Sequence, residues 1–138
     1  MKKLISLFLI TCMLIGPTCF AEEVSPCATN IMDISSTILK GDGYLLGSVT
    51  ATFSGTGLHA IFECHIQYQT SSGAWYNVDD GRITRCYNPG EPYTTNAYYY
   101  SPEVGTTYRF HTYMRVVDSD GYLHDAEVAN SPTYVYRG

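Results

Sequence analysis

Hydrophobic and polar residues alternate one by one along most of this chain, and a period of two is typical of half-buried β-strands. No segment after residue 21 has the apolar spacing of three to four residues that a long amphipathic helix needs. Short glycine-bearing stretches separate the alternating segments. We therefore expect strands at residues 31–39, 44–54, 62–68, 74–78, 82–86, 93–100, 106–117, 122–129 and 133–136.

The segment at residues 106–117 shows the alternation most clearly. The side chains on one of its sides are mostly apolar and should face a core. These residues are Phe110, Thr112, Met114 and Val116. The side chains on the other side should face solvent. These residues are Arg109, His111, Tyr113 and Arg115.

Turn signals between the segments indicate how the strands are connected. Asp120-Gly121 is a typical hairpin turn, and the two prolines at 89 and 92 mark a loop. Pro132 interrupts the last segment, which must therefore be an edge strand or a bulged strand. About seven short strands at this spacing are typical of a single all-β domain, a two-sheet sandwich, and we place it at residues 31–138.

The stretch 102–108, Pro-Glu-Val-Gly-Thr-Thr-Tyr, resembles the start of the sixth strand of immunoglobulin-like, fibronectin type III-like domains. In that family the matching tyrosine packs at the corner between the sheets and bonds back to the backbone, which implies this structural role for Tyr108. Trp75 is similar to the tryptophan in a hairpin of many such secreted sandwiches. The family's early core tryptophan is absent, and Phe53 and aliphatic residues occupy the second strand instead. The chain also resembles small exported sandwich proteins of Gram-positive bacteria whose function is uncharacterised.

The first 21 residues have the order of a secretory signal peptide. Lys2 and Lys3 precede an apolar run at residues 4–15, and the small Ala21 precedes the polar Glu22. We expect a cleaved signal peptide at 1–21, an N-terminal extension at 22–30, and a secreted protein that is extracellular or associated with the cell wall.

Two other fates of this N-terminal segment are disfavoured. A transmembrane anchor would need a longer apolar run to span a bilayer about 30 Å thick. Lipidation at Cys12 or Cys19 does not fit the residues that precede either cysteine. No contact with a membrane is therefore expected after cleavage.

The charge balance excludes some partners. Removing residues 1–21 leaves six basic and thirteen acidic residues, a net charge of −7. An acidic surface repels nucleic acids and anionic membranes, so neither is an expected partner.

Three cysteines remain after cleavage, at positions 27, 64 and 86. Export permits a disulfide, and the favoured candidate pair is Cys64–Cys86, which would close a loop of about 20 residues and contribute roughly 3 kcal/mol. An equally open alternative is that all three are reduced, with Cys64 packed as a small apolar side chain. A catalytic cysteine is disfavoured because no nucleophile motif surrounds any of them.

The acidic and histidine residues form no recognisable catalytic or metal motif. The segment 118–121 with Glu127 matches part of an EF-hand loop, but Val116 stands at its first ligand position. A hairpin turn explains the same residues better. No histidine pair has zinc spacing, and no nucleophile or phosphate motif occurs. We expect no enzyme activity, no cofactor and no metal.

Thirteen tyrosines are the remaining anomaly. Ordinary β-propensity explains many of them, yet tyrosines on a neutral serine- and threonine-rich background are also typical of binding surfaces. Of the consecutive tyrosines 98–100, either Tyr99 or both of its neighbours should point outward. The candidate binding surface comprises Tyr113, Arg109, Arg115 and Tyr99.

These observations favour a secreted, non-enzymatic module that binds an extracellular protein or glycan of unknown identity. The alternative is an inhibitor of an extracellular enzyme, which would present a loop such as residues 88–93 or 54–60 to an active site.

A first prediction concerns processing. The secreted protein should begin at Glu22, because Ala21 is the small residue that precedes the polar switch. Mass spectrometry of the secreted material tests this, and an intact or acylated N-terminus would contradict it.

Overall fold

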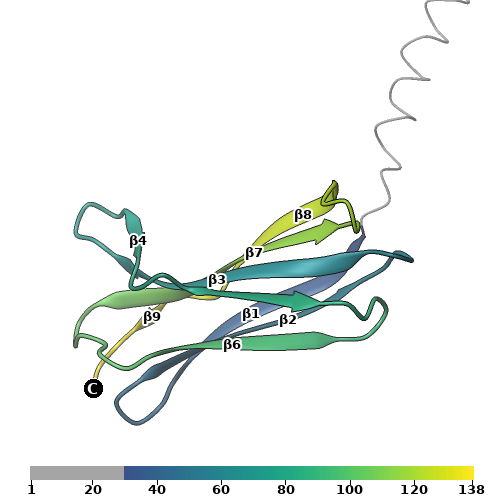
Figure 1. The fold of residues 1–138 in the computed structure, drawn as a ribbon. Coiled ribbons are helices and arrows are strands. Elements are labelled where there is room, and N and C mark those ends of the chain that lie inside the picture. Colours follow the sequence, from purple (N-terminus) through teal and green to yellow (C-terminus); the bar gives the residue numbers. More distant parts are fainter. Residues whose placement is uncertain (1–29) are drawn as a thin grey trace, which may run out of the picture.

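The computed structural model describes residues 30–138, which form two antiparallel β-sheets packed face to face (Figure 1). The predicted signal peptide at 1–21 and all but the last residue of the predicted extension lie outside the described residues. Among residues 30–138 there is no helix long and apolar enough to cross a membrane.

The structure has a strand in each of the nine segments that the alternation predicts, so the all-β class is confirmed. In chain order the strands are β1 (Ile31–Lys40), β2 (Leu45–Phe53), β3 (His59–Gln69), β4 (Trp75–Asn77), β5 (Arg82–Cys86), β6 (Tyr93–Tyr99), β7 (Thr107–Val117), β8 (Leu123–Asn130) and β9 (Tyr134–Val135).

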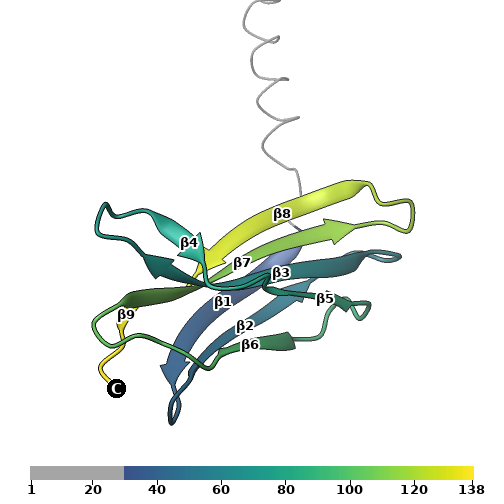
Figure 2. The same ribbon diagram turned by 60° about the vertical axis from the view of Figure 1, so that its left-hand side comes forward.

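The strands divide into a three-stranded sheet, β1-β2-β6, and a six-stranded sheet built around β3 and β7. β4 and β5 pair with successive parts of β3, and β8 and β9 pair with successive parts of β7. Figure 2 shows β4 and β5 as separate pieces beside β3. The six strands therefore fill only four positions across the sheet. With the three-stranded sheet, the nine strands occupy seven positions, which matches the predicted count of about seven. β9 lies after Pro132 on the edge position that the proline predicts.

The core lies between the two sheets and follows the alternation of β2, β3 and β7. Its fully buried large side chains include Leu45, Val49, Phe53, Phe62, Ile66, Phe110, Met114 and Val116. Gly47 in β2 allows a close approach between the sheets, because a Cβ there would lie 2.1 Å from the ring of Phe110. The ring of Phe110 on β7 thus packs directly on the backbone of β2 at Gly47.

The predicted Cys64–Cys86 disulfide is not formed, and both residues are free, buried thiols. They lie on adjacent strands, but Cys64 pairs with Arg82 and Cys86 pairs with Ala60. This register separates them by four positions, about 13 Å at a strand rise of about 3.3 Å per residue. A disulfide needs Cα atoms within about 7 Å of each other, so the pairing is excluded by geometry.

Tyr108, at the start of β7, is 2 % exposed. Its hydroxyl accepts a hydrogen bond of 2.8 Å from the backbone N–H of Glu103, five residues upstream. Its ring lies beside Tyr99 of the opposite sheet, with centroids 6.0 Å apart. The side chain therefore fastens the β6–β7 connection to the end of the core.

Replacing Tyr108 with phenylalanine should reduce the free energy of unfolding by about 1–3 kcal/mol, because the backbone N–H of Glu103 loses its acceptor. Denaturant titration measures this change. Tyr100→Phe is the control, since Tyr100 is 70 % exposed. Equal stability of the two variants would contradict a stabilising role for the Tyr108 hydroxyl.

Candidate functional site

The outer face is defined here as the surface of the six-stranded sheet that points away from the three-stranded sheet. The strand registers bring together on it side chains from four strands. They are Glu63, His65 and Gln67 from β3, Trp75 and Asn77 from β4, Arg109, His111, Tyr113 and Arg115 from β7, and Val128 and Asn130 from β8.

The predicted orientation of β7 is confirmed. Phe110, Thr112, Met114 and Val116 are each 0 % exposed. The alternate residues Arg109, His111, Tyr113 and Arg115 are half-buried on the outer face. Sequence alternation alone therefore placed three of the four candidate binding residues on one surface.

Arg109 is held in place by two contacts on the outer face. Its guanidinium carbon lies 4.3 Å from the ring centroid of Trp75, and its Nε donates a hydrogen bond of 2.8 Å to Oε1 of Gln67. Partial burial lowers the pKa of Arg109 from its usual value. Further along the strand, the guanidinium of Arg115 lies 5.7 Å from the ring centroid of Tyr113.

The middle of the outer face is hollowed into a cavity of about 270 Å³. Its lining residues are Glu63, His65, Gln67, Asn77, His111, Tyr113 and Val128. Every one of them except Val128 carries a polar group. The hollow joins Tyr113 to the amide and imidazole groups of neighbouring strands, which the sequence spacing did not reveal.

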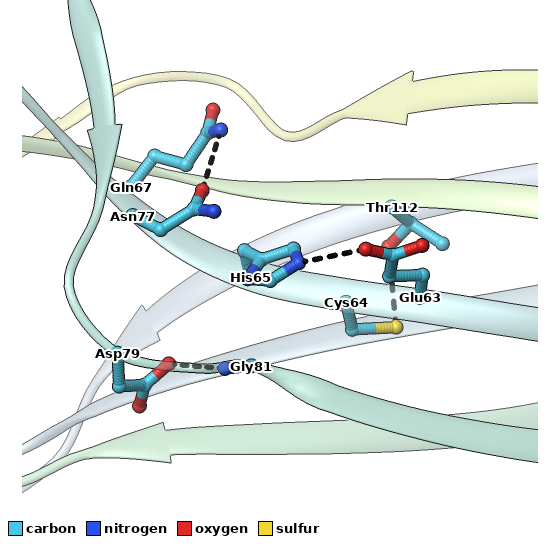
Figure 3. Close-up of polar contacts among 8 residues, drawn as sticks. All are labelled: Glu63, Cys64, His65, Gln67, Asn77, Asp79, Gly81 and Thr112. Atoms are coloured by element: carbon cyan, nitrogen blue, oxygen red, sulfur yellow. Dashed lines mark hydrogen bonds and ion pairs between the residues drawn. The ribbon is translucent and has the colours of Figure 1, made fainter.

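His65 is one of the polar side chains in this hollow, and 13 % of its side chain is exposed, against 41 % for Glu63. Its Nε2 lies 3.4 Å from Oε1 of Glu63 (Figure 3), while its Nδ1 is buried without a hydrogen-bond partner among the described residues. The cover is the turn at Gly81, where a Cβ would lie 2.3 Å from Nδ1. His65 thus points to the outer face but is largely covered, because the turn between β4 and β5 folds over its ring.

Three further hydrogen bonds fix the polar groups around His65. Nε2 of Gln67 donates to Oδ1 of Asn77 over 2.9 Å, and the N–H of Gly81 donates to Oδ1 of Asp79 over 2.8 Å (Figure 3). His111, directly opposite His65, has its Nδ1 2.7 Å from Oδ1 of Asn130. The outer face is thus a pre-ordered polar surface.

Cys64 points away from this surface and into the core (Figure 3). Burial raises the pKa of its thiol, and the hydrogen bond of 3.6 Å from the hydroxyl of Thr112 opposes this only in part. A thiol without thiolate character is a poor nucleophile. Cys64 is therefore a packing residue.

Tyr99 does not belong to the outer face, so the structure does not bring it together with Tyr113, Arg109 and Arg115. It belongs to the three-stranded sheet and packs, half-buried, against the core. Burial, followed by the proximity of Tyr108, raises the pKa of Tyr99. Its neighbours Tyr98 and Tyr100 are 43 % and 70 % exposed and form a cluster with Tyr44. Of the two orientations that the sequence left open, the structure therefore has the one with Tyr98 and Tyr100 outward and Tyr99 inward.

The acidic turn that resembles part of a calcium loop is a hairpin turn. The carboxylate of Asp118 accepts bonds from the backbone N–H groups of Asp120 and Tyr122 and from Nε2 of His124. The bond from His124 is the main reason why the pKa of Asp118 lies below its usual value. Within residues 30–138, no group of three acidic, histidine or cysteine side chains is placed to hold a metal ion.

Comparison with known proteins adds a fold likeness and no family. No family model and no curated protein sequence matches the chain. The chain is similar to the crystal structure of a Bordetella pertussis protein described as a candidate ApaA protein, with a TM-score of 0.43, 11% identity, and coverage of 79% of this chain and 95% of that one.

A second similar structure is that of structural genomics target SoR45, with a TM-score of 0.39 and 11% identity. The matched region covers 76% of this chain and 84% of the chain of that target. The shared feature is a two-sheet all-β arrangement.

Gly81→Ala should destabilise the fold by about 1–3 kcal/mol, because Gly81 has a φ of +73° and a Cβ would also lie 2.5 Å from the backbone oxygen of Cys64. Gly90→Ala is the matched control, since Gly90 has a φ of +88° but nothing within 4 Å. Denaturant titration measures the stability of both variants. Gly90→Ala reports the cost of backbone strain alone, whereas Gly81→Ala adds the overlap of the new Cβ with His65 and Cys64. An equal loss in the two would contradict the packing of the turn on His65.

Proposed function

We propose that the protein is a secreted, non-enzymatic binding module with an immunoglobulin-like, fibronectin type III-like sandwich. The outer face of its six-stranded sheet binds an extracellular partner, with a protein favoured over a glycan. The fold assignment draws support from the sheets β1-β2-β6 and β5-β3-β7-β8 and from the bond between Tyr108 and the backbone of Glu103.

The observation that carries the proposal is the fixed position of Arg109 between Trp75 and Gln67. Tryptophan, tyrosine and arginine are the residues that contribute most to protein interfaces. A side chain that is already ordered loses little rotamer entropy when a partner binds. Arg109, Trp75, Tyr113 and Arg115 together supply this residue mix on one surface.

The hydrogen bonds of the outer face favour recognition over catalysis. The imidazole of His65 contacts Glu63, and that of His111 contacts Asn130. Neither is paired with a nucleophile, and the buried Cys64 thiol faces the other way. The polar groups are therefore arranged to present hydrogen-bonding positions.

The two loops that an inhibitor would present, residues 54–60 and 88–93, pack against each other and against the end of β2. Gly57, Leu58 and Pro89, from the two candidate loops, line one shared hollow of about 480 Å³. The backbone N–H of Gly90 also donates to the backbone oxygen of Phe53 over 2.7 Å. Neither loop has the disulfide anchor that would favour an inhibitor, so the binding module is the better-supported function.

Tyr113→Ala should leave the melting transition nearly unchanged and weaken partner binding by about 1 kcal/mol or more. Surface changes away from the core usually alter stability by less than about 0.5 kcal/mol. The partner is obtained by affinity capture from culture supernatant and cell-wall extract with the mature domain.

Tyr122→Ala is the control, because Tyr122 is 72 % exposed on the β7–β8 turn and lies outside the outer face. Equal affinity of the two variants for the captured partner would contradict the proposed surface. A large loss of stability in Tyr113→Ala would contradict the surface role of this residue.

A further inference from the structure

β3 and β6 end, and β7 begins, at the same end of the sandwich (Figure 1). Another cavity, of about 470 Å³, is lined by residues from this end. Its lining residues are Tyr68, Gln69, Val78, Tyr99, Glu103, Thr106 and Tyr108. None of them lines the hollow of the outer face. Its volume lies within the range of roughly 300–1,000 Å³ that is typical of small-molecule sites.

The lining of this cavity is dominated by hydroxyl groups. Three tyrosines and Thr106 contribute hydroxyls, Gln69 contributes an amide, and Glu103 contributes a carboxylate. A hydroxyl can donate one hydrogen bond and accept others, whereas a carboxylate only accepts. No basic side chain belongs to the lining described for this cavity.

Short-range contacts order the walls of the cavity. The hydroxyl of Tyr108 accepts its bond from the N–H of Glu103, so it keeps its own proton to donate. The N–H of Thr106 donates to the backbone oxygen of Glu103 over 3.2 Å, and the N–H of Gly105 donates to the backbone oxygen of Tyr136 over 2.8 Å. These bonds hold residues 103–106 in a fixed turn beside the three tyrosine rings.

We propose that this cavity binds one or two rings of a neutral saccharide. Saccharide hydroxyls both donate and accept, so they can satisfy the tyrosine hydroxyls and Glu103 at once, while aromatic rings cover the apolar C–H faces of the sugar. The ammonium group of an organic cation would offer no acceptor to the hydroxyl protons. A sugar phosphate or a sialic acid would place its negative charge near Glu103 without a basic partner.

The cavity is a site separate from the outer face, so this inference goes beyond the proposed function. The test uses the secreted mature protein and four neutral disaccharides: cellobiose, maltose, lactose and N,N′-diacetylchitobiose. Titration calorimetry should show saturable binding of at least one of them. Backbone amide shifts in heteronuclear NMR spectra should change mainly at residues 103–106.

Two variants test whether the disaccharide binds in this cavity. Neither removes the hydrogen bond from the backbone N–H of Glu103 to the hydroxyl of Tyr108. Glu103→Gln and Tyr68→Phe should each weaken disaccharide binding roughly five- to tenfold, the loss expected for one polar contact. Tyr100→Phe is the matched control, because this exposed tyrosine lies outside the cavity. It should leave the affinity unchanged.

Several results would overturn the proposal. They are no saturable binding of any of the four disaccharides, binding that both cavity variants leave intact, or binding of choline chloride in their place. Tyr113→Ala should not alter disaccharide binding, and Glu103→Gln should not alter binding of the captured partner. Failure of the saccharide site is therefore distinguishable from failure of the outer-face proposal.

Discussion

The pairing register of β3 with β7 is the constraint on which the rest of this molecule depends. It runs without a shift from His59 opposite Val117 to Tyr68 opposite Tyr108. Because side chains alternate between the two faces of a sheet, a slip of one residue would exchange the faces of a whole strand. The register therefore decides at the same time which side chains build the core and which build the outer face.

The packing of Phe110 on Gly47 fixes which face of β7 points into the core. A side chain on Gly47 would overlap the ring, so the glycine and the phenylalanine specify each other across the two sheets. With Phe110 inward, Arg109 and His111 must point outward. The order of the outer face is thus a consequence of core packing, and Arg109 needs no special loop to place it.

Alternation predicted all nine strand positions and the orientation of β7, because those properties depend on local periodicity. It failed where the answer depends on strand pairing. Chain spacing suggested Cys64–Cys86, but only the register reveals the separation of four positions. The orientation of Tyr99 was ambiguous because the buried polar Thr95 hides the alternation of β6. The burial of His65 was also hidden, since it depends on a turn from a different strand.

The start of β7 connects the two proposed sites through the backbone. Tyr108 lines the cavity, whereas the next residue, Arg109, contacts Trp75 on the outer face. On β3, Gln67 anchors Arg109, and Gln69, two residues on, lines the cavity. The same strand pair that separates core from surface therefore places both sites on one rigid support.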